Sequence, residues 1–257
     1  MLVAFLLISQ LSLLPQLDGL FLIFSRDLIN PTITNMASSV PTPIAIVGYS
    51  CKLPGDVSSP EDLWELCSRG RSGWGPTPST RYNKDAYYHP APGKQGCINT
   101  EGGYFLQEDP ARFDAPFFNM TVQEATALDP QQRLLLECTF EAFESSGMTK
   151  EGVAGTDVGV FVGGSFADYE VHNTRDIDTA PTYQATGCAP AMQSNRLSYY
   201  FDLRGPSMTV DTACSSSLVA LHSAMQSLRN GESSSAVVAA AHLNLSPDFF
   251  VTMSNTQ

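Results

Sequence analysis

Residues 206–222 read Pro-Ser-Met-Thr-Val-Asp-Thr-Ala-Cys-Ser-Ser-Ser-Leu-Val-Ala-Leu-His. A short apolar run at residues 207–210 predicts a strand, and residues 215–230 follow as an amphipathic helix that Gly231 closes. The apolar stripe expected on one face of this helix is Leu218, Leu221, Met225 and Leu228. Cys214 stands in the turn between them, where its small neighbours leave room for a substrate. The dipole and the unpaired N–H groups of a helix N-terminus favour the thiolate form of a cysteine. The pattern therefore predicts a cysteine nucleophile for acyl chemistry, with backbone N–H groups that can face an oxyanion.

The segments around this stretch alternate between apolar runs and amphipathic patterns. Strands are predicted at residues 44–47, 158–162 and 236–245, where nearly every position is apolar. Helices are predicted at residues 60–67, 130–146 and 190–201. Asp129 and Pro130 suit the start of the second of these helices, and Gln132 can complete a capping box. Apolar strands that alternate with helices indicate an α/β layered fold with both faces of the sheet covered.

Length, composition and charge narrow the class of protein. A chain of 257 residues with 43% apolar residues can form one large domain or two small ones. The net charge of −12 argues against a nucleic-acid partner and against a polybasic membrane contact, because both need a basic surface. The six cysteines lack the spacing of a zinc site or a disulfide framework and indicate free thiols, so we expect a cytoplasmic protein.

The N-terminal segment needs a separate explanation. Residues 1–14 are almost wholly apolar, a run too short to span a bilayer. No Lys or Arg precedes the run, and no clear Ala-x-Ala cleavage site follows it. We therefore expect residues 1–35 to be an extension outside the fold and residues 36–257 to be the folded part, with Met36 as a second candidate start. A signal peptide over residues 1–30, which would direct the chain to the secretory pathway, and a membrane anchor are the alternatives.

The other thiols and the histidines favour structural or surface roles. The cysteines expected to be small core residues are Cys51, Cys67, Cys138 and Cys188. His222 follows Cys214 on the same predicted helix at about 12 Å, too far for a hydrogen bond, so we expect it to pack against a neighbouring element. We expect His89 and His172 to lie on the surface. His242 follows in a later predicted strand, and no motif marks it as catalytic.

Several separated motifs resemble the ketosynthase domain of modular and iterative type I polyketide synthases. Residues 206–222 resemble the active-site segment of that domain. The other matching segments are residues 44–48 (Ile-Ala-Ile-Val-Gly), 129–137 (Asp-Pro-Gln-Gln-Arg-Leu-Leu-Leu-Glu), 159–163 (Gly-Val-Phe-Val-Gly) and 195–206 (Asn-Arg-Leu-Ser-Tyr-Tyr-Phe-Asp-Leu-Arg-Gly-Pro). The likeness covers residues 43–255 in the right order, and its style is that of a fungal reducing polyketide synthase.

The resemblance implies the N-terminal half of a thiolase-like layered fold, with a mixed sheet covered by helices. It implies acyl transfer to Cys214 and a decarboxylative Claisen condensation that builds a polyketide chain. In the family the backbone N–H of this cysteine helps to hold the oxyanion, and neither a metal nor a redox cofactor takes part. An acyl carrier protein brings the acyl and malonyl thioesters on a phosphopantetheine arm, and full-length members are homodimers.

The sequence departs from the family pattern in two ways. The two histidines that promote decarboxylation in the family, one in a His-Gly-Thr-Gly-Thr segment, would follow Gln257, and His242 stands where the family usually has Asn. Ala239 and Ala240 replace two glycines, and extra methyl groups in a tight core cost about 1–3 kcal/mol. We therefore expect a partial gene model or a pseudogene product. A catalytically incomplete remnant that only binds or dimerises, and a cysteine hydrolase that needs a base near Cys214, are the alternative functions.

Overall fold

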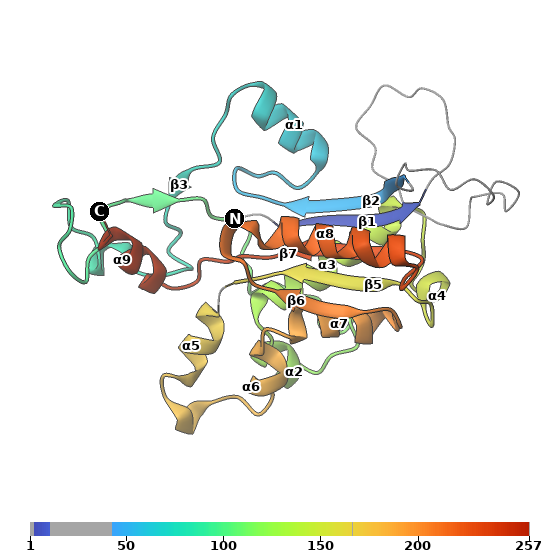
Figure 1. The fold of residues 1–257 in the computed structure, drawn as a ribbon. Helices are drawn as coiled ribbons and strands as arrows, with labels where there is room; N and C mark the ends of the chain where they lie inside the picture. Colours follow the sequence, from blue (N-terminus) through green and yellow to red (C-terminus); the bar gives the residue numbers. More distant parts are fainter. Residues whose placement is uncertain (1–2, 11–42, 166, 257) are drawn as a thin grey trace, which may run out of the picture.

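The computed structural model of the protein describes residues 3–10, 43–165 and 167–256 (Figure 1). Within these residues a five-stranded mixed sheet forms the centre, in the order β2-β1-β7-β5-β6. Its strands are β1 (Val3–Gln10), β2 (Ile44–Lys52), β5 (Gly159–Gly163), β6 (Ser207–Val210) and β7 (Ala236–Ala240). Strand β5 is parallel to both β6 and β7, whereas β1 is antiparallel to β2 and β7. The carboxyl ends of β5, β6 and β7 therefore lie at the same edge of the sheet.

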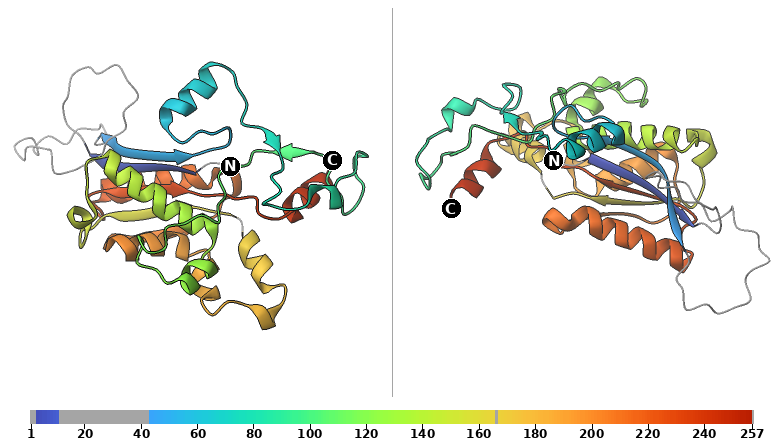
Figure 2. Two further views of the ribbon diagram at one scale, coloured as in Figure 1. Left: turned by 180° about the vertical axis from the view of Figure 1, so that it is seen from behind. Right: turned by 90° about the horizontal axis from the view of Figure 1, so that it is seen from above.

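Helices cover both faces of this sheet. Helices α3 (Pro130–Ser145) and α7 (Met192–Phe201) pack on one face, and α8 (Ser216–Asn230) lies on the other (Figure 1, Figure 2). The side chains of β5 alternate between the two sides. Val160 and Val162 belong to the core beneath α3 and α7, whereas Phe161 belongs to the core beneath α8. Every residue of β5 is buried, which confirms a layered α/β arrangement.

Shorter elements surround this layered centre. The short helices are α1 (Pro60–Ser68), α2 (Val122–Ala127), α4 (Lys150–Val153), α5 (Asp168–Thr174), α6 (Gln184–Cys188) and α9 (Asp248–Ser254). Single 3₁₀ turns span Lys84–Ala86, Ile177–Thr179 and Ala213–Ser215, and β3 (Gly75–Pro76) pairs with β4 (Gly102–Gly103). Among the described residues, no helix has both the length and the apolar character that a membrane crossing needs.

The start of α3 shows how tertiary contacts alter a local pattern. Asp129 caps the helix as predicted: its Oδ1 accepts from the backbone N–H of Gln131 at 2.8 Å, and Pro130 begins the first turn. The predicted capping box is wrong, because the backbone N–H of Asp129 donates to the carbonyl oxygen of Gly187 at 2.9 Å. The side chain of Gln132 has other partners: its Nε2 donates to the same carbonyl oxygen at 2.8 Å, and its Oε1 accepts from Nε of Arg196 at 3.3 Å. Gln132 is only 1% exposed, and a buried amide must find its partner within the protein.

Helix α8 confirms the long helix predicted after Cys214, but the expected apolar stripe is only partly right. The buried positions that pack on the sheet are Ala220, Ala224 and Leu228. The predicted stripe was Leu218, Leu221, Met225 and Leu228, and Leu218 is 67% exposed. Small residues thus bring α8 close to the sheet, Leu228 and the partly buried Leu221 complete the contact, and Leu218 lies on the outer side.

The placement of Val3–Gln10 differs from the expectation that residues 1–35 lie outside the fold. The structure places this segment as β1 between β2 and β7, where Leu6 is the register partner of both Tyr49 and Val238. An apolar run of this length suits a strand whose backbone groups are hydrogen-bonded on both sides. The rest of the extension, residues 11–42 with Met36, lies outside the described residues.

Candidate active site

Cys214 lies in the turn between β6 and α8. Residues Ala213–Ser215 form one 3₁₀ turn, and α8 begins directly after it at Ser216. Cys214 itself is exposed. The structure thus gives this thiol the strand–turn–helix position that the sequence predicts, where an electrophile can reach it.

Hydrogen bonds from side chains hold the turn in place. Oγ of Ser216 accepts from the backbone N–H of Thr212 at 2.8 Å and donates to the carbonyl oxygen of Ala213 at 2.7 Å. The N–H of Ala213 donates to Oδ1 of Asp211 at 2.9 Å. Ala213 has a φ of 54°, a left-handed conformation that costs a residue other than glycine about 1–3 kcal/mol. The hydrogen bonds offset this strain and fix the backbone next to Cys214.

Cys214 lines a cavity of about 660 Å³, a size that is typical of small-molecule sites. The walls are predominantly apolar and come from five places: the end of β5, the turn after β6, the first turn of α8, the end of β7, and α9. Lining residues from these places include Gly164, Asp211, Ala240, His242, Phe249 and Met253. The cavity lies at the edge where the three parallel strands end, and an apolar wall of this kind can hold a hydrocarbon chain.

Two glycines at the end of β5 allow this close assembly. A Cβ at Gly163 would lie 2.7 Å from the backbone carbonyl carbon of Ser216, at the start of α8. A Cβ at Gly164 would lie 2.0 Å from Oε1 of Gln193. Both distances are shorter than van der Waals contact. Glycine at position 163 therefore lets the N-terminus of α8, and with it Cys214, lie directly against the sheet.

Three of the other thiols differ from Cys214 in exposure and chemistry. Burial raises the pKa of Cys51 to about 11 and that of Cys188 to about 12, and it raises the pKa of Cys138 as well. These three are buried, as predicted. The prediction for Cys67 is wrong: this residue is exposed, because α1 lies at the surface and buries none of its residues. The three buried thiols are chemically inert at neutral pH, because the thiolate is the reactive form.

Sequence reasoning missed His242, which lines the same cavity as Cys214. Its ring Nε2 lies 2.8 Å from Oδ1 of Asn244. Burial lowers the pKa of His242, and the hydrogen bond to Asn244 opposes this effect only in part. The signal that could have located His242 is topological. It follows β7 just as Cys214 follows β6, and parallel strands of one sheet place such residues at the same edge.

The other histidines do not approach this cavity. His222 is exposed on α8, so the expectation that it packs against a neighbouring element is wrong. His172 is exposed as predicted, and half-buried His89 accepts at Nδ1 from the backbone N–H of Ala91 at 3.1 Å. Among the four histidines, all of which the structure describes, only His242 lines the cavity of Cys214.

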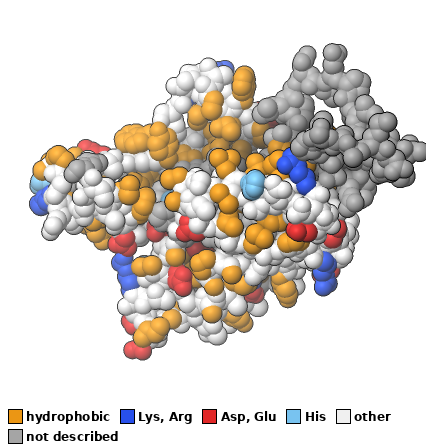
Figure 3. Space-filling model, in the orientation of Figure 1, with side chains coloured by type: hydrophobic (Ala, Val, Ile, Leu, Met, Phe, Trp, Pro, Cys, Tyr) orange, Lys and Arg blue, Asp and Glu red, His pale blue; other side chains and the backbone are white. Residues whose placement is uncertain are grey.

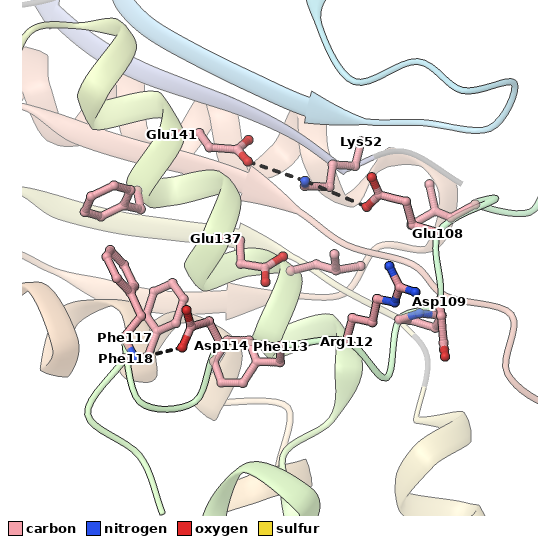
Figure 4. Close-up of a pocket in the computed structure, with 14 residues that line it drawn as sticks. Lys52, Glu108, Asp109, Arg112, Phe113, Asp114, Phe117, Phe118, Glu137 and Glu141 are labelled. Atoms are coloured by element: carbon pink, nitrogen blue, oxygen red, sulfur yellow. Dashed lines mark hydrogen bonds and ion pairs between the residues drawn. The ribbon is translucent and has the colours of Figure 1, made fainter.

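A second cavity of about 490 Å³ lies beside α3 and carries several charges (Figure 4). Nζ of Lys52 lies 3.4 Å from Glu141 and 3.9 Å from Glu108. Burial raises the pKa of Glu137, whose carboxylate lies near the two ion pairs in Figure 4. This cavity shares no lining residue with that of Cys214. The charged side chains of this second cavity therefore do not line the site of the Cys214 thiol.

Comparison with known proteins places these features in a family. Residues 41–257 match the family model "Beta-ketoacyl synthase, N-terminal domain". The chain is 93% identical over 222 residues to highly-reducing polyketide synthase 1 of Aureobasidium melanogenum, covering 86% of this chain and 10% of that protein. It is 52% identical over 218 residues to compactin diketide synthase mlcB of Penicillium citrinum, covering 85% of this chain and 8% of that one. The chain thus spans about a tenth of these relatives.

Solved structures agree with the sequence comparison. A ketosynthase domain of the oxazolomycin system of Streptomyces albus JA3453 superposes with a TM-score of 0.74 at 30% identity, covering 82% of this chain and 36% of that one. The ketosynthase from module 6 of the bacillaene synthase of Bacillus subtilis 168 gives a TM-score of 0.72 at 31% identity, with 82% and 34% covered. These likenesses confirm the predicted thiolase-like α/β fold. Family model, relatives and fold agree, and the chain belongs to the beta-ketoacyl synthase family, of which it carries the N-terminal domain.

Proposed function

We propose that Cys214 accepts an acyl group as a thioester, and that the whole protein uses this thioester in the decarboxylative Claisen condensation of polyketide synthesis. The observation that carries the proposal is the placement of Cys214. Its exposed thiol lies just before the N-terminus of α8 and lines an apolar cavity of about 660 Å³. The names of the relatives, which are highly reducing polyketide synthases and diketide synthases, support the same chemistry.

In the first half-reaction, Sγ of Cys214 attacks the carbonyl carbon of an incoming acyl thioester. A new C–S bond forms, the old C–S bond breaks, and the released thiol takes up the proton that Cys214 gives away. We propose that the backbone N–H of Cys214 donates to the oxyanion, because N–H groups at the start of a helix point toward such a charge. In the second half-reaction, a malonyl thioester loses CO₂ and its carbanion displaces Cys214 from the acyl carbon.

The partners follow from the same proposal. An acyl carrier protein would present the acyl and malonyl groups on its phosphopantetheine arm, and the protein itself would bind no cofactor. A homodimer is supported by β6, which ends the sheet on one side and carries Met208 at 40% exposure.

We place the protein in the cytoplasm because all six cysteines are free thiols. We retain residues 36–257 as the domain of the synthase, with β1 added to its sheet.

Acylation can be measured directly by intact-protein mass spectrometry. The chain is incubated with the hexanoyl thioester of N-acetylcysteamine, and peptide mapping locates the acyl group. We expect one hexanoyl group on Cys214, none in Cys214→Ser, and unchanged acylation in Cys67→Ser, which removes another exposed thiol. Equal labelling of Cys67 and Cys214, or no loss of labelling in Cys214→Ser, would contradict the proposal.

A further inference from the structure

The second cavity, beside α3, is lined by aromatic rings and by charged side chains (Figure 4). Its volume of about 490 Å³ lies within the range of small-molecule sites. The rings form a row in which the centroids of each neighbouring pair are 5.0 Å apart, in the order Phe113, Phe118, Phe117 and Phe140. Phe117 is 50% exposed although its side chain is large and apolar. The phenylalanine row therefore offers aromatic surface that a ligand can contact.

The charged part of the lining carries an excess of negative charge. Of the described residues that line the cavity, Lys52 and Arg112 are cations, and five carry carboxylates: Glu108, Asp109, Asp114, Glu137 and Glu141. Nζ of Lys52 lies 3.4 Å from Glu141 and 3.9 Å from Glu108, so one ammonium group serves two carboxylates. Arg112 lies beside Asp109 in Figure 4. The two cations thus leave part of the negative charge of the cavity uncompensated.

Glu137 is the carboxylate that has no cation of its own. It points from α3 into the cavity (Figure 4), and within the described residues its side chain makes neither a hydrogen bond nor an ion pair. Burial is the main cause that raises the pKa of Glu137, and the charges of Glu141 and Glu108 act in the same direction. The charges of Lys52 and Arg133 oppose them. A cation from outside the chain would stabilise the ionised form of this half-buried carboxylate.

The same aromatic cluster already contacts a cation of the chain itself. Nζ of Lys150 lies 3.7 Å from the centroid of the Tyr200 ring, and this centroid is 5.0 Å from that of Phe118. A metal ion fits the lining less well, because among the described residues no three His, Cys, Asp or Glu side chains are grouped so that they could hold one. Aromatic rings beside a carboxylate favour an organic cation instead.

We propose that this cavity binds a small arylalkylammonium ion, whose ammonium group donates to the carboxylate of Glu137 and whose ring lies against the phenylalanine row. The carboxylate and the rings both stabilise a positive charge that has left water. The cavity shares no lining residue with that of Cys214, so the inference goes beyond the proposed acyl chemistry and can fail independently of it.

Binding can be measured on the full 257-residue chain by saturation-transfer NMR, which observes the ligand and tolerates an associated protein. The probe is phenethylammonium, and 3-phenylpropionate presents a similar body with the opposite charge. We expect phenethylammonium to bind at pH 7 and 3-phenylpropionate not to bind. Equal binding of the two probes, or binding of neither, would overturn the inference.

Two variants assign the contacts. Glu137→Gln keeps the shape of the side chain and removes its charge, so it should weaken the binding of phenethylammonium about 10-fold, the effect of one charge-assisted hydrogen bond. Phe117→Leu should weaken it about 2- to 5-fold, the effect of one exposed cation–π contact. The matched control is Glu144→Gln, which removes the same charge from α3 outside this cavity and should leave the affinity unchanged. Unchanged affinity in Glu137→Gln would contradict the proposal.

A variant with the opposite expected effect protects the test against a loss of structure. Lys52→Gln removes the cation that pairs with Glu108 and Glu141, so the cavity becomes more negative. This variant should bind phenethylammonium about 2- to 5-fold more tightly, whereas a damaged cavity would bind it more weakly. Circular dichroism measures whether each variant is folded. Weaker binding by a folded Lys52→Gln variant would overturn the inference.

Discussion

Single side chains show how well the interior of this domain is packed and hydrogen-bonded. Ala239 and Ala240, which replace glycines of the family pattern, are accommodated in β7: Ala239 is 0% exposed, and Ala240 lines the cavity of Cys214. Gln193 is less well placed. It is 4% exposed, and within the described part of the chain its Oε1 is buried with no hydrogen-bond partner. A buried polar atom without a partner costs about 1–3 kcal/mol.

We predict that Gln193→Leu stabilises the protein by about 1 kcal/mol, because it removes this buried oxygen and leaves a side chain of similar volume. The matched control is Gln132→Leu. Gln132 is as deeply buried, but its side chain donates to the carbonyl oxygen of Gly187 at 2.8 Å and accepts from Arg196 at 3.3 Å. Gln132→Leu removes both hydrogen bonds and should therefore destabilise the protein by about 1–3 kcal/mol. Urea unfolding followed by circular dichroism measures both changes. A destabilised Gln193→Leu variant would show that its oxygen has a partner.

Whole elements show how local patterns and tertiary contacts combine. The start of α3 and the strand–turn–helix around Cys214 follow from local residue types, because caps and turns depend on near neighbours in the chain. Local residue types do not determine which other elements each helix or strand packs against. Asp129 illustrates the difference: its capping role follows from the sequence, but its 2% exposure follows from the packing of α3. Burial raises the pKa of Asp129 to about 6, although hydrogen bonds from Gln131 oppose this effect.

This raised pKa gives α3 a pH dependence with a definite sign. Between pH 4 and pH 6 the folded state holds a proton on Asp129 that the unfolded state has lost. The free energy of unfolding therefore falls by about 3 kcal/mol as the pH rises through this range. Asn is also a good N-cap, and Asp129→Asn should remove this slope. Urea unfolding at pH 4.5 and pH 7 should show the variant gaining stability relative to the unaltered protein as pH rises, whereas parallel curves would contradict the prediction.

On the scale of the molecule, the domain leaves apolar surface uncovered. Figure 3 shows hydrophobic side chains at the surface of the face that carries α8. Leu218 on this helix is 67% exposed, and Met208 on the edge strand β6 is 40% exposed. An uncovered helix face next to an open sheet edge favours association between copies of the chain.

We therefore predict that the chain is oligomeric or poorly soluble when it is expressed alone. Light scattering coupled to gel filtration should give a mass above that of one chain. Replacing Leu218 and Met208 by Glu should shift the mass toward the monomer. The matched control is Val122→Glu, at a site on α2 that is 79% exposed. This variant should leave the mass unchanged. A sharp monomeric peak with cooperative melting for the unaltered chain would contradict this prediction.

The sequence by itself determined the α/β class, the turn that carries Cys214, the N-cap of α3 and the family. These features depend on short stretches whose periodicity and residue types act locally. Only the tertiary structure decided which residues meet. It brought His242 to the cavity of Cys214, turned Cys67 and His222 outward, and placed Val3–Gln10 between β2 and β7. Sheet order and helix orientation join residues far apart in the chain, and no local pattern encodes such contacts.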